Sequence, residues 1–341
     1  MALVYSDRWI FNGTHLVKRG WSNRLASWGD PFVLGVTDPY LNPNMVGAGF
    51  LRPITNLTPL THASGTITVG DGETLVDRII NARVDIVGTG ALENCIVRGP
   101  ADGSSGTQRP LVQTTTATPR DPDPDGPNSS FNVRFCTISP QTPSPWMSGV
   151  GPKYYHMRRN LIENIVDGLA SFSQTIDGLV RSYDEGSLIR TMVQFRPDDA
   201  NSRPSTHNDG EQLQGNKGDR FDIYRRGTSY SGRLSTVYGF QPMYEPREHH
   251  SCVGLNVNTQ TSVNGTWDGC FFRGGLRGMN GGGITATGPS HIVLSNCMFE
   301  RPGTDPLAPP VAATINASID RTGCADNFYF DNGAPVSIGF N

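Results

Sequence analysis

The chain has 341 residues and a formal net charge of −3, and only 17% of its residues are charged. Its 40 glycines and 25 prolines exceed the usual share of these residues and favour many turns and short strands over long, salt-bridged helices. The slightly acidic balance argues against nucleic acid as a partner, and the sequence lacks the run of about 18 apolar residues that predicts a membrane-spanning helix.

Residues 1–65 are expected to form an irregular leader that covers the end of the following fold or mediates assembly. Prolines interrupt every regular pattern in this stretch, at Pro31, Pro39, Pro43, Pro53 and Pro59. The first residues have no basic segment followed by an apolar one, so no secretory signal peptide is expected.

A short pattern repeats along the rest of the chain, with a cysteine followed by two mostly apolar residues. It occurs at 94–98, 135–139, 269–273 and 296–300, and the last two cysteines are 27 residues apart. A further copy at 160–163 is aligned with Leu161 in place of cysteine. Strand-like runs of about 4–6 residues with apolar–polar alternation separate the copies. Such spacing is typical of a parallel β-helix, in which each coil stacks about 4.8 Å from the next.

The repeats therefore predict an all-β fold, a single-stranded right-handed parallel β-helix over residues 66–300. Polar stretches at about 101–130 and 228–250 are expected to be long loop excursions, and 301–341 a C-terminal cap or tail. The repeated cysteines are expected to point inward as reduced core residues, because stacked in-register side chains have poor disulfide geometry. Asn94 and Asn296, each before a cysteine, are expected at turns with left-handed backbone.

The densest group of polar residues lies at 206–215 and includes His207, Asp209 and Glu211. A pair of carboxylates there could hydrolyse a glycosidic bond as acid and base. Alternatively, His207 could abstract a proton next to a uronate carboxyl group and cleave the chain by elimination. The alternative is a purely structural role, in which Asn208-Asp209-Gly210 forms a turn.

Glu211 shares the alternation of Leu213, which predicts that it faces the core and needs a buried partner. A strand that begins one residue later is the alternative. Asp167 and Asp177 each precede Gly-Leu, much as Asp209 precedes Gly-Glu, so the three carboxylates are expected near one another on successive coils. There they could bind substrate or Ca²⁺, or they could be ordinary turn residues.

Further candidate substrate-binding residues surround this motif. They are Asn208 and Gln212 within it, Arg203 before it and Tyr224 after it. Tyr224 begins an aromatic and Arg-containing stretch that could stack on sugars or contact another subunit. An ordinary solvated loop is the alternative for Arg203 and for this stretch.

No metal site or cofactor is predicted. Neither a Cys-x-x-Cys nor a His-x-x-x-His pair occurs, so zinc has no local support. Asp121, Asp123 and Asp125 resemble the start of a calcium loop, but Asn132 stands where the bidentate glutamate is required. A solvated acidic loop is favoured there, with Ca²⁺ as the weaker alternative.

The run from Thr66 to Gly99 resembles the opening coils of pectate-lyase-like right-handed parallel β-helix proteins. The element His207-Asn208-Asp209-Gly210-x-Gln212 is similar to a His-Asn-Asp-Gly-Ile-Gln element in one branch of them, which includes minor tail proteins of phages that infect actinobacteria. This chain has Glu211 where that branch usually has isoleucine. It also lacks a clear pectate-lyase cluster of calcium-binding carboxylates and a clear polygalacturonase set of Asn-Thr-Asp, Asp-Asp and Gly-His-Gly, so the resemblance carries no activity.

Three functions follow as alternatives. The resemblance implies a tail protein of a phage virion, assembled in the host cytoplasm and homotrimeric, that contacts other tail proteins and binds host envelope polysaccharide. A polysaccharide lyase or glycoside hydrolase acting through His207, Asp209 and Glu211 is the second. A purely structural virion component is the third.

Overall fold

The computed structural model describes most of the chain. The described residues are 3–6, 9–11, 16–18, 32–34, 39–41, 46–101, 109–118, 131–172, 178–190, 192–195, 208–215, 218–231, 234–238, 250–257, 261–274, 277–281, 290–301, 311–315, 319–329, 334–336 and 338–340. Strands and turns make up these residues, and none of them forms a helix. Across this part of the chain no helix is therefore long and apolar enough to cross a membrane.

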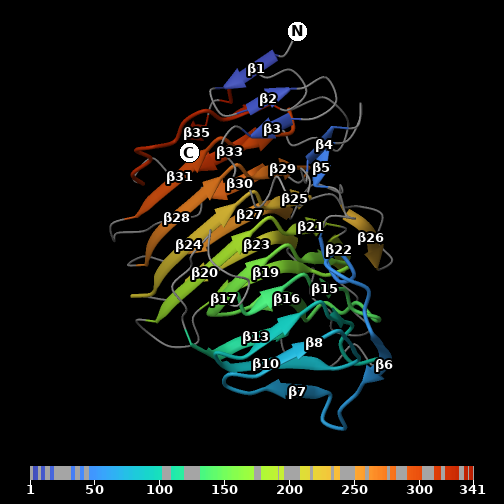
Figure 1. The fold of residues 1–341 in the computed structure, drawn as a ribbon. Helices are drawn as coiled ribbons and strands as arrows, with labels where there is room; N and C mark the ends of the chain where they lie inside the picture. The colour runs from blue at the N-terminus through green and yellow to red at the C-terminus, as the bar shows by residue number, and fades with distance from the viewer. Residues whose placement is uncertain are drawn as a thin grey trace.

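Three parallel sheets, here called I, II and III, form the body of the molecule (Figure 1). Sheet I contains β7 (Thr66–Val69), β10 (Arg83–Gly88), β13 (Arg109–Ala117), β16 (Met147–Gly151), β19 (Asp167–Phe172), β23 (Asn208–Gly215), β27 (His250–Val257), β30 (Arg277–Gly281), β33 (Val311–Ile315) and β35 (Gly339–Phe340). Sheet II contains β8 (Thr74–Val76), β11 (Ala91–Glu93), β14 (Val133–Arg134), β17 (Tyr154–Arg158), β20 (Leu179–Glu185), β24 (Arg220–Arg226), β28 (Ser262–Asp268) and β31 (His291–Ser295). Sheet III contains β6 (Asn56–Leu60), β9 (Arg78–Ile80), β12 (Ile96–Val97), β15 (Thr137–Ile138), β18 (Leu161–Glu163), β21 (Leu188–Arg190), β25 (Ser229–Ser231), β29 (Phe271–Arg273), β32 (Met298–Phe299) and β34 (Phe328–Tyr329).

The chain visits the sheets in the order I, II, III, and each strand pairs in parallel with the strand one coil away. β10, for example, pairs with β7 before it and β13 after it. Figure 1 shows the coils rising from β7, in blue at the bottom, to β33 in orange-red at the top. This arrangement confirms the predicted all-β parallel β-helix.

The remaining strands form small sheets of their own. β1 (Leu3–Ser6), β2 (Trp9–Phe11) and β3 (Leu16–Lys18) form one antiparallel sheet, and β4 (Phe32–Leu34) with β5 (Pro39–Leu41) another. β22 (Met192–Phe195) and β26 (Leu234–Tyr238) form a parallel pair.

The stacked sheets reach beyond the range 66–300. β6 already belongs to sheet III, and β33, β34 and β35 continue the sheets after residue 300. The stretch 101–130 contains the nine-residue strand β13, which pairs with both neighbouring coils. Strands β25 and β26 likewise lie within 228–250. The expected excursions are therefore partly strand, because their polar composition hid short runs such as Leu111–Val112 that fill the core.

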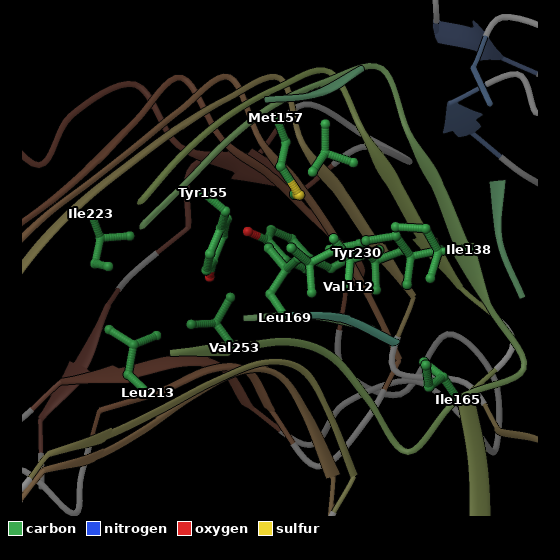
Figure 2. Packing of buried hydrophobic residues seen from close by; sticks show 14 of the residues in the cluster. Val112, Ile138, Tyr155, Met157, Ile165, Leu169, Leu213, Ile223, Tyr230 and Val253 are labelled. Carbon is green, nitrogen blue, oxygen red and sulfur yellow. The ribbon is translucent and has the colours of Figure 1, made fainter. Parts of the chain in front are cut away.

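Alternation of side chains builds the core. In β24, Phe221, Ile223 and Arg225 are buried, and the residues between them are partly exposed. Side chains of all three sheets meet in the centre, as Figure 2 shows for Leu213 of sheet I, Ile223 of sheet II and Tyr230 of sheet III. Apolar burial along a continuous column is the main driving force for stacking coils of this kind.

The turn from sheet II to sheet III has left-handed backbone at one position in every coil. Asn94 and Asn296 have φ of 55° and 54°, as their place before cysteine predicted. The other members are Asp77, Phe135, Arg159, Gly186, Gly227, Gly269 and Asp326. A single residue with positive φ lets the chain turn sharply between two short strands.

The residues after this turn form an inward column in which cysteine is one of several small residues. Cys95, Cys136, Cys270 and Cys297 are free and buried, as predicted. The alignment of the copy at 160–163 was wrong by one residue. Thr137 pairs with Leu161, so Asn160 stands beside Cys136 and accepts its amide hydrogen bond at 2.8 Å.

Residues 46–55 of the leader run along the side of the coil, across the turns from sheet II to sheet III. The Gly47 amide donates to the Arg159 carbonyl, and the Gly49 amide donates to the side chain of Asn94 on an earlier coil. Arg52 forms ion pairs with Asp77 and Glu93. Phe50 also stacks on Phe135 with ring centroids 6.2 Å apart. This part of the leader ties successive coils together along their flank.

Candidate functional site

Glu211 faces the interior of the coil, as its alternation with Leu213 predicted. Its side chain is fully buried and forms an ion pair with Arg225, which is equally buried. The guanidinium makes two hydrogen bonds to the carboxylate, of 2.5 and 3.1 Å, and the Tyr230 hydroxyl donates a third of 2.8 Å. The alternative of a later strand start is thereby removed.

Arg225 is satisfied by further interior groups. It donates to the Ser182 carbonyl at 2.9 Å, to the Ser182 hydroxyl at 2.7 Å and to the Tyr155 hydroxyl at 3.2 Å. Burial alone would lower the pKa of Arg225, but the Glu211 carboxylate and the neighbouring tyrosines raise it above its usual value. Burial also raises the pKa of Tyr155 to about 12. The network therefore holds one fixed ion pair between two neutral tyrosine hydroxyls, with Tyr230 donating to Glu211 and Tyr155 accepting from Arg225.

This placement has a chemical consequence for Glu211. All the atoms that touch its carboxylate belong to the protein interior, so a polymer on the outside of the coil does not reach it. A general acid must lie within hydrogen-bond reach of the bond it cleaves. In this structure Glu211 is a core residue with a charged partner and is not positioned for catalysis.

Asp167 and Asp209 occupy the same position on adjacent strands of sheet I. Leu169 pairs with Glu211, which places the two aspartates in register, and the Asp209 amide donates to the Asp167 carboxylate at 3.0 Å. The predicted proximity of these two carboxylates is thus present. Each residue is only 1% exposed.

The Asp209 carboxylate lies on the outer side of sheet I. Gln212 points outward, because its neighbours Glu211 and Leu213 point inward. Gly254 is paired with Gln212 on the next strand, so a side chain at Gly254 would also point outward. A Cβ on Gly254 would lie 2.6 Å from an Asp209 carboxylate oxygen. The missing side chain at Gly254 therefore makes room for this carboxylate.

The other predicted site residues divide into two groups. His207, Arg203 and Asp177 lie outside the described residues, as does the side chain of Asn208. Gly178, which follows Asp177, donates its amide to Asp219 and leads into sheet II, whereas Asp167 and Asp209 belong to sheet I. The described part of this copy, Gly178 and Leu179, therefore lies at the start of sheet II, and the expected proximity of Asp177 to the other two aspartates stays a prediction.

Gln212 and Tyr224 are the predicted site residues that are partly exposed. Gln212 lies on the outer side of sheet I, and Tyr224 on the outer side of sheet II between inward-facing Ile223 and Arg225. They therefore belong to different faces of the coil.

The outer face of sheet II carries a column of polar residues that sequence inspection did not single out. Arg181, Asp222, Asn264 and His291 are in register on four successive coils. Asp222 accepts hydrogen bonds from Arg181 at 3.2 Å and from Asn264 at 3.1 Å, and its side chain is 40% exposed. The alternating patterns of 220–226 and 262–268 already indicated which of their polar residues face outward. Which of these residues lie side by side depends on how the two strands pair, and the sequence does not show that pairing.

A second buried carboxylate lies deeper in the coil. Asp184 accepts hydrogen bonds of 2.5 Å from the hydroxyls of Ser187 and Thr228. Burial raises its pKa to about 6, and these hydroxyls only partly counter the effect. No cation contacts it among the described residues, in contrast to Glu211. Asp184 is thus a titratable group of the core.

Metal ligands do not converge in this structure as far as it is described. Within the described ranges no group of three or more His, Cys, Asp and Glu side chains could hold a metal ion. Residues 121–125 of the candidate calcium loop lie outside those ranges.

The fold and these faces define a parallel β-helix protein with a polar outer surface and a charged pair in its core. No family model, curated protein or solved structure matches the chain.

Proposed function

We propose that this protein binds a polysaccharide of a host cell envelope along the outer face of its β-helix, as a tail protein of a phage virion. The observation that carries the glycan proposal is the exposed polar column of sheet II, with Asp222 and Asn264 at its centre. One polar residue per coil gives a regular row of hydrogen-bonding groups, which suits a polymer whose sugars also repeat regularly.

The assignment to a virion rests on the sequence resemblance to phage minor tail proteins. In this proposal the protein is assembled in the host cytoplasm, contacts other tail proteins and forms a homotrimer. Light scattering on the purified chain tests the last point, with a monomer at micromolar concentration as the contrary result.

Binding is favoured over cleavage because two of the three predicted catalytic residues are buried. Glu211 is paired with Arg225 in the core, and Asp209 is 1% exposed. A glycoside hydrolase acting through Asp167 and Asp209 is the second candidate. The two residues stand in register on adjacent strands, and the Asp209 amide donates to the Asp167 carboxylate, so two carboxylates of the kind that glycosidases use lie close together.

Co-sedimentation with envelope polysaccharides of candidate actinobacterial hosts tests the proposal. Both bound protein and polysaccharide chain length are followed, with Asp209→Asn as the matched variant. Binding without shortening supports the adhesin, and shortening that Asp209→Asn abolishes supports the hydrolase. If the polysaccharide is neither bound nor shortened, both the adhesin and the hydrolase are contradicted, and a structural virion component is favoured.

A further inference from the structure

An aromatic column crosses the outer face of sheet II and ends at Tyr224. Tyr183 and Tyr224 pair in register on β20 and β24, and their rings stack with centroids 5.2 Å apart and an interplanar angle of 11°. On the other side, Tyr183 contacts Phe131 at 5.7 Å and His156 at 6.2 Å. Tyr183 is consequently 2% exposed, whereas Tyr224 is only half-buried.

The next position of this column holds a small residue. Thr266 pairs with Tyr224 on the following coil, and threonine has no ring that could continue the stack. An aromatic column inside the coil, on sheet III, does continue, because Phe272 and Phe299 on successive coils stack at 4.7 Å with an angle of 13°. The geometry of the fold thus provides a place for one more flat or disc-shaped group against Tyr224.

Polar side chains surround that place on both strands. Asp222 and Arg226 flank Tyr224 on β24, and Asn264 and Asp268 flank Thr266 on β28. All four positions point outward by alternation, and Asn264 is exposed. A pyranose ring combines the features that this arrangement matches, because its C–H face is apolar and its hydroxyl groups lie around the edge.

We propose that a neutral pyranose ring binds over Thr266 with one face stacked on Tyr224 and its hydroxyls on Asp222 and Asn264. The inference rests on the proposed function and assigns one sugar subsite to sheet II, apart from the aspartates of sheet I. Asp222 is already paired with Arg181, and Asp268 accepts hydrogen bonds from Ser295 and Asn296, so a phosphorylated aromatic ligand such as a nucleotide is included in the test as the competing outcome.

Saturation-transfer NMR and titration of the full chain with the methyl glycosides of glucose, galactose and mannose test this subsite. We expect at least one of them to bind, Tyr224→Ala to weaken it roughly tenfold, and Tyr224→Phe to retain it. Thr266→Phe should extend the aromatic column without harming the fold. We expect it to weaken sugar binding roughly tenfold or more. Gln214→Ala, at an exposed position of sheet I, should leave the affinity unchanged.

Two results would overturn the subsite. One is that none of the three glycosides binds the wild-type protein, including the case in which adenosine monophosphate binds instead. The other is that Thr266→Phe, shown to be folded by its unfolding temperature, binds the sugar as the wild type does. Polysaccharide binding that persists in Thr266→Phe would remove the subsite and leave the proposed function standing, whereas wild-type protein that binds no envelope polysaccharide would remove the proposed function itself.

Discussion

Glu211 of sheet I and Arg225 of sheet II form a two-bonded ion pair across the interior of the coil, with neither side chain exposed. The two residues come from different sheets, so the pair fixes how the strands β23 and β24 face each other. A buried charge is tolerated only when a partner and hydrogen bonds replace its lost hydration.

Removing one partner of this pair should destabilise the protein strongly. In Arg225→Met the Glu211 carboxylate stays buried without its cation, and we expect a loss of roughly 3–5 kcal/mol in the free energy of unfolding. The measurement is urea unfolding followed by circular dichroism. The double variant Glu211→Leu/Arg225→Met should recover most of the loss, and a double variant as unstable as the single one would contradict this account.

The pH dependence of stability should contain a contribution from Asp184. Its folded-state pKa of about 6 lies above the ordinary value of 3.8, so between these values the unfolded chain has released a proton that the folded protein still holds. Raising the pH through this window therefore destabilises the fold, by up to about 3 kcal/mol, and the loss stays constant above it.

Asp184→Asn removes that titration. We expect the stability advantage of the wild type over this variant to shrink as the pH rises from about 4 to about 6.5. Unfolding free energies of both proteins across this range provide the comparison. A difference that does not change with pH would mean that Asp184 titrates normally in the folded protein.

Close approach of adjacent coils limits the residue at Gly168. A Cβ there would lie 2.5 Å from the Gly210 carbonyl oxygen of the next coil. We expect Gly168→Ala to destabilise the protein by roughly 1–3 kcal/mol, because the backbone must shift to accept the methyl group. Ser148→Ala, in the neighbouring strand β16, is the matched control and should cost little, since the buried Ser148 hydroxyl has no hydrogen-bond partner within the described part of the chain. Equal melting temperatures of Gly168→Ala and wild type would contradict the prediction.

The left-handed turn from sheet II to sheet III should discriminate among side chains at Gly269, where φ is 62°. Gly269→Val should destabilise by roughly 1–2 kcal/mol, because a β-branched residue is strained in this conformation. Gly269→Asn should be better tolerated, since asparagine occupies the same position at 94 and 296. Thermal unfolding of the two variants tests this order, and a valine variant at least as stable as the asparagine variant would refute it.

Local sequence patterns were sufficient for the fold and for one buried site residue. The cysteine repeat predicted the coil, and asparagine before cysteine predicted the left-handed turns. Alternation placed Glu211 inward correctly, and the same rule applied to 221–225 would have placed Arg225 there as well. The pairing of Glu211 with Arg225 was not predictable, because it depends on how two sheets face each other.

The errors arose where residue identity differs between coils at one structural position. Asn160 stands in the cysteine column, so an alignment by apolar character shifted that copy to Leu161. The Asp-Gly pairs at 167–168 and 209–210 share a column, but Gly178 leads into another sheet with the same local pattern. The column of Arg181, Asp222 and Asn264 shares no residue type at all, and only the register brings these side chains together.

The most direct test of the glycan-binding proposal is the affinity of the full chain for a host envelope polysaccharide, measured for wild type and for Asp222→Ala/Asn264→Ala. These residues form the centre of the exposed column and are outside the core. We predict that the wild type binds and that the double variant, with an unchanged melting temperature, binds at least about tenfold more weakly. Equal affinities of the two proteins, or no binding by either, would contradict the assignment of this face to the polysaccharide.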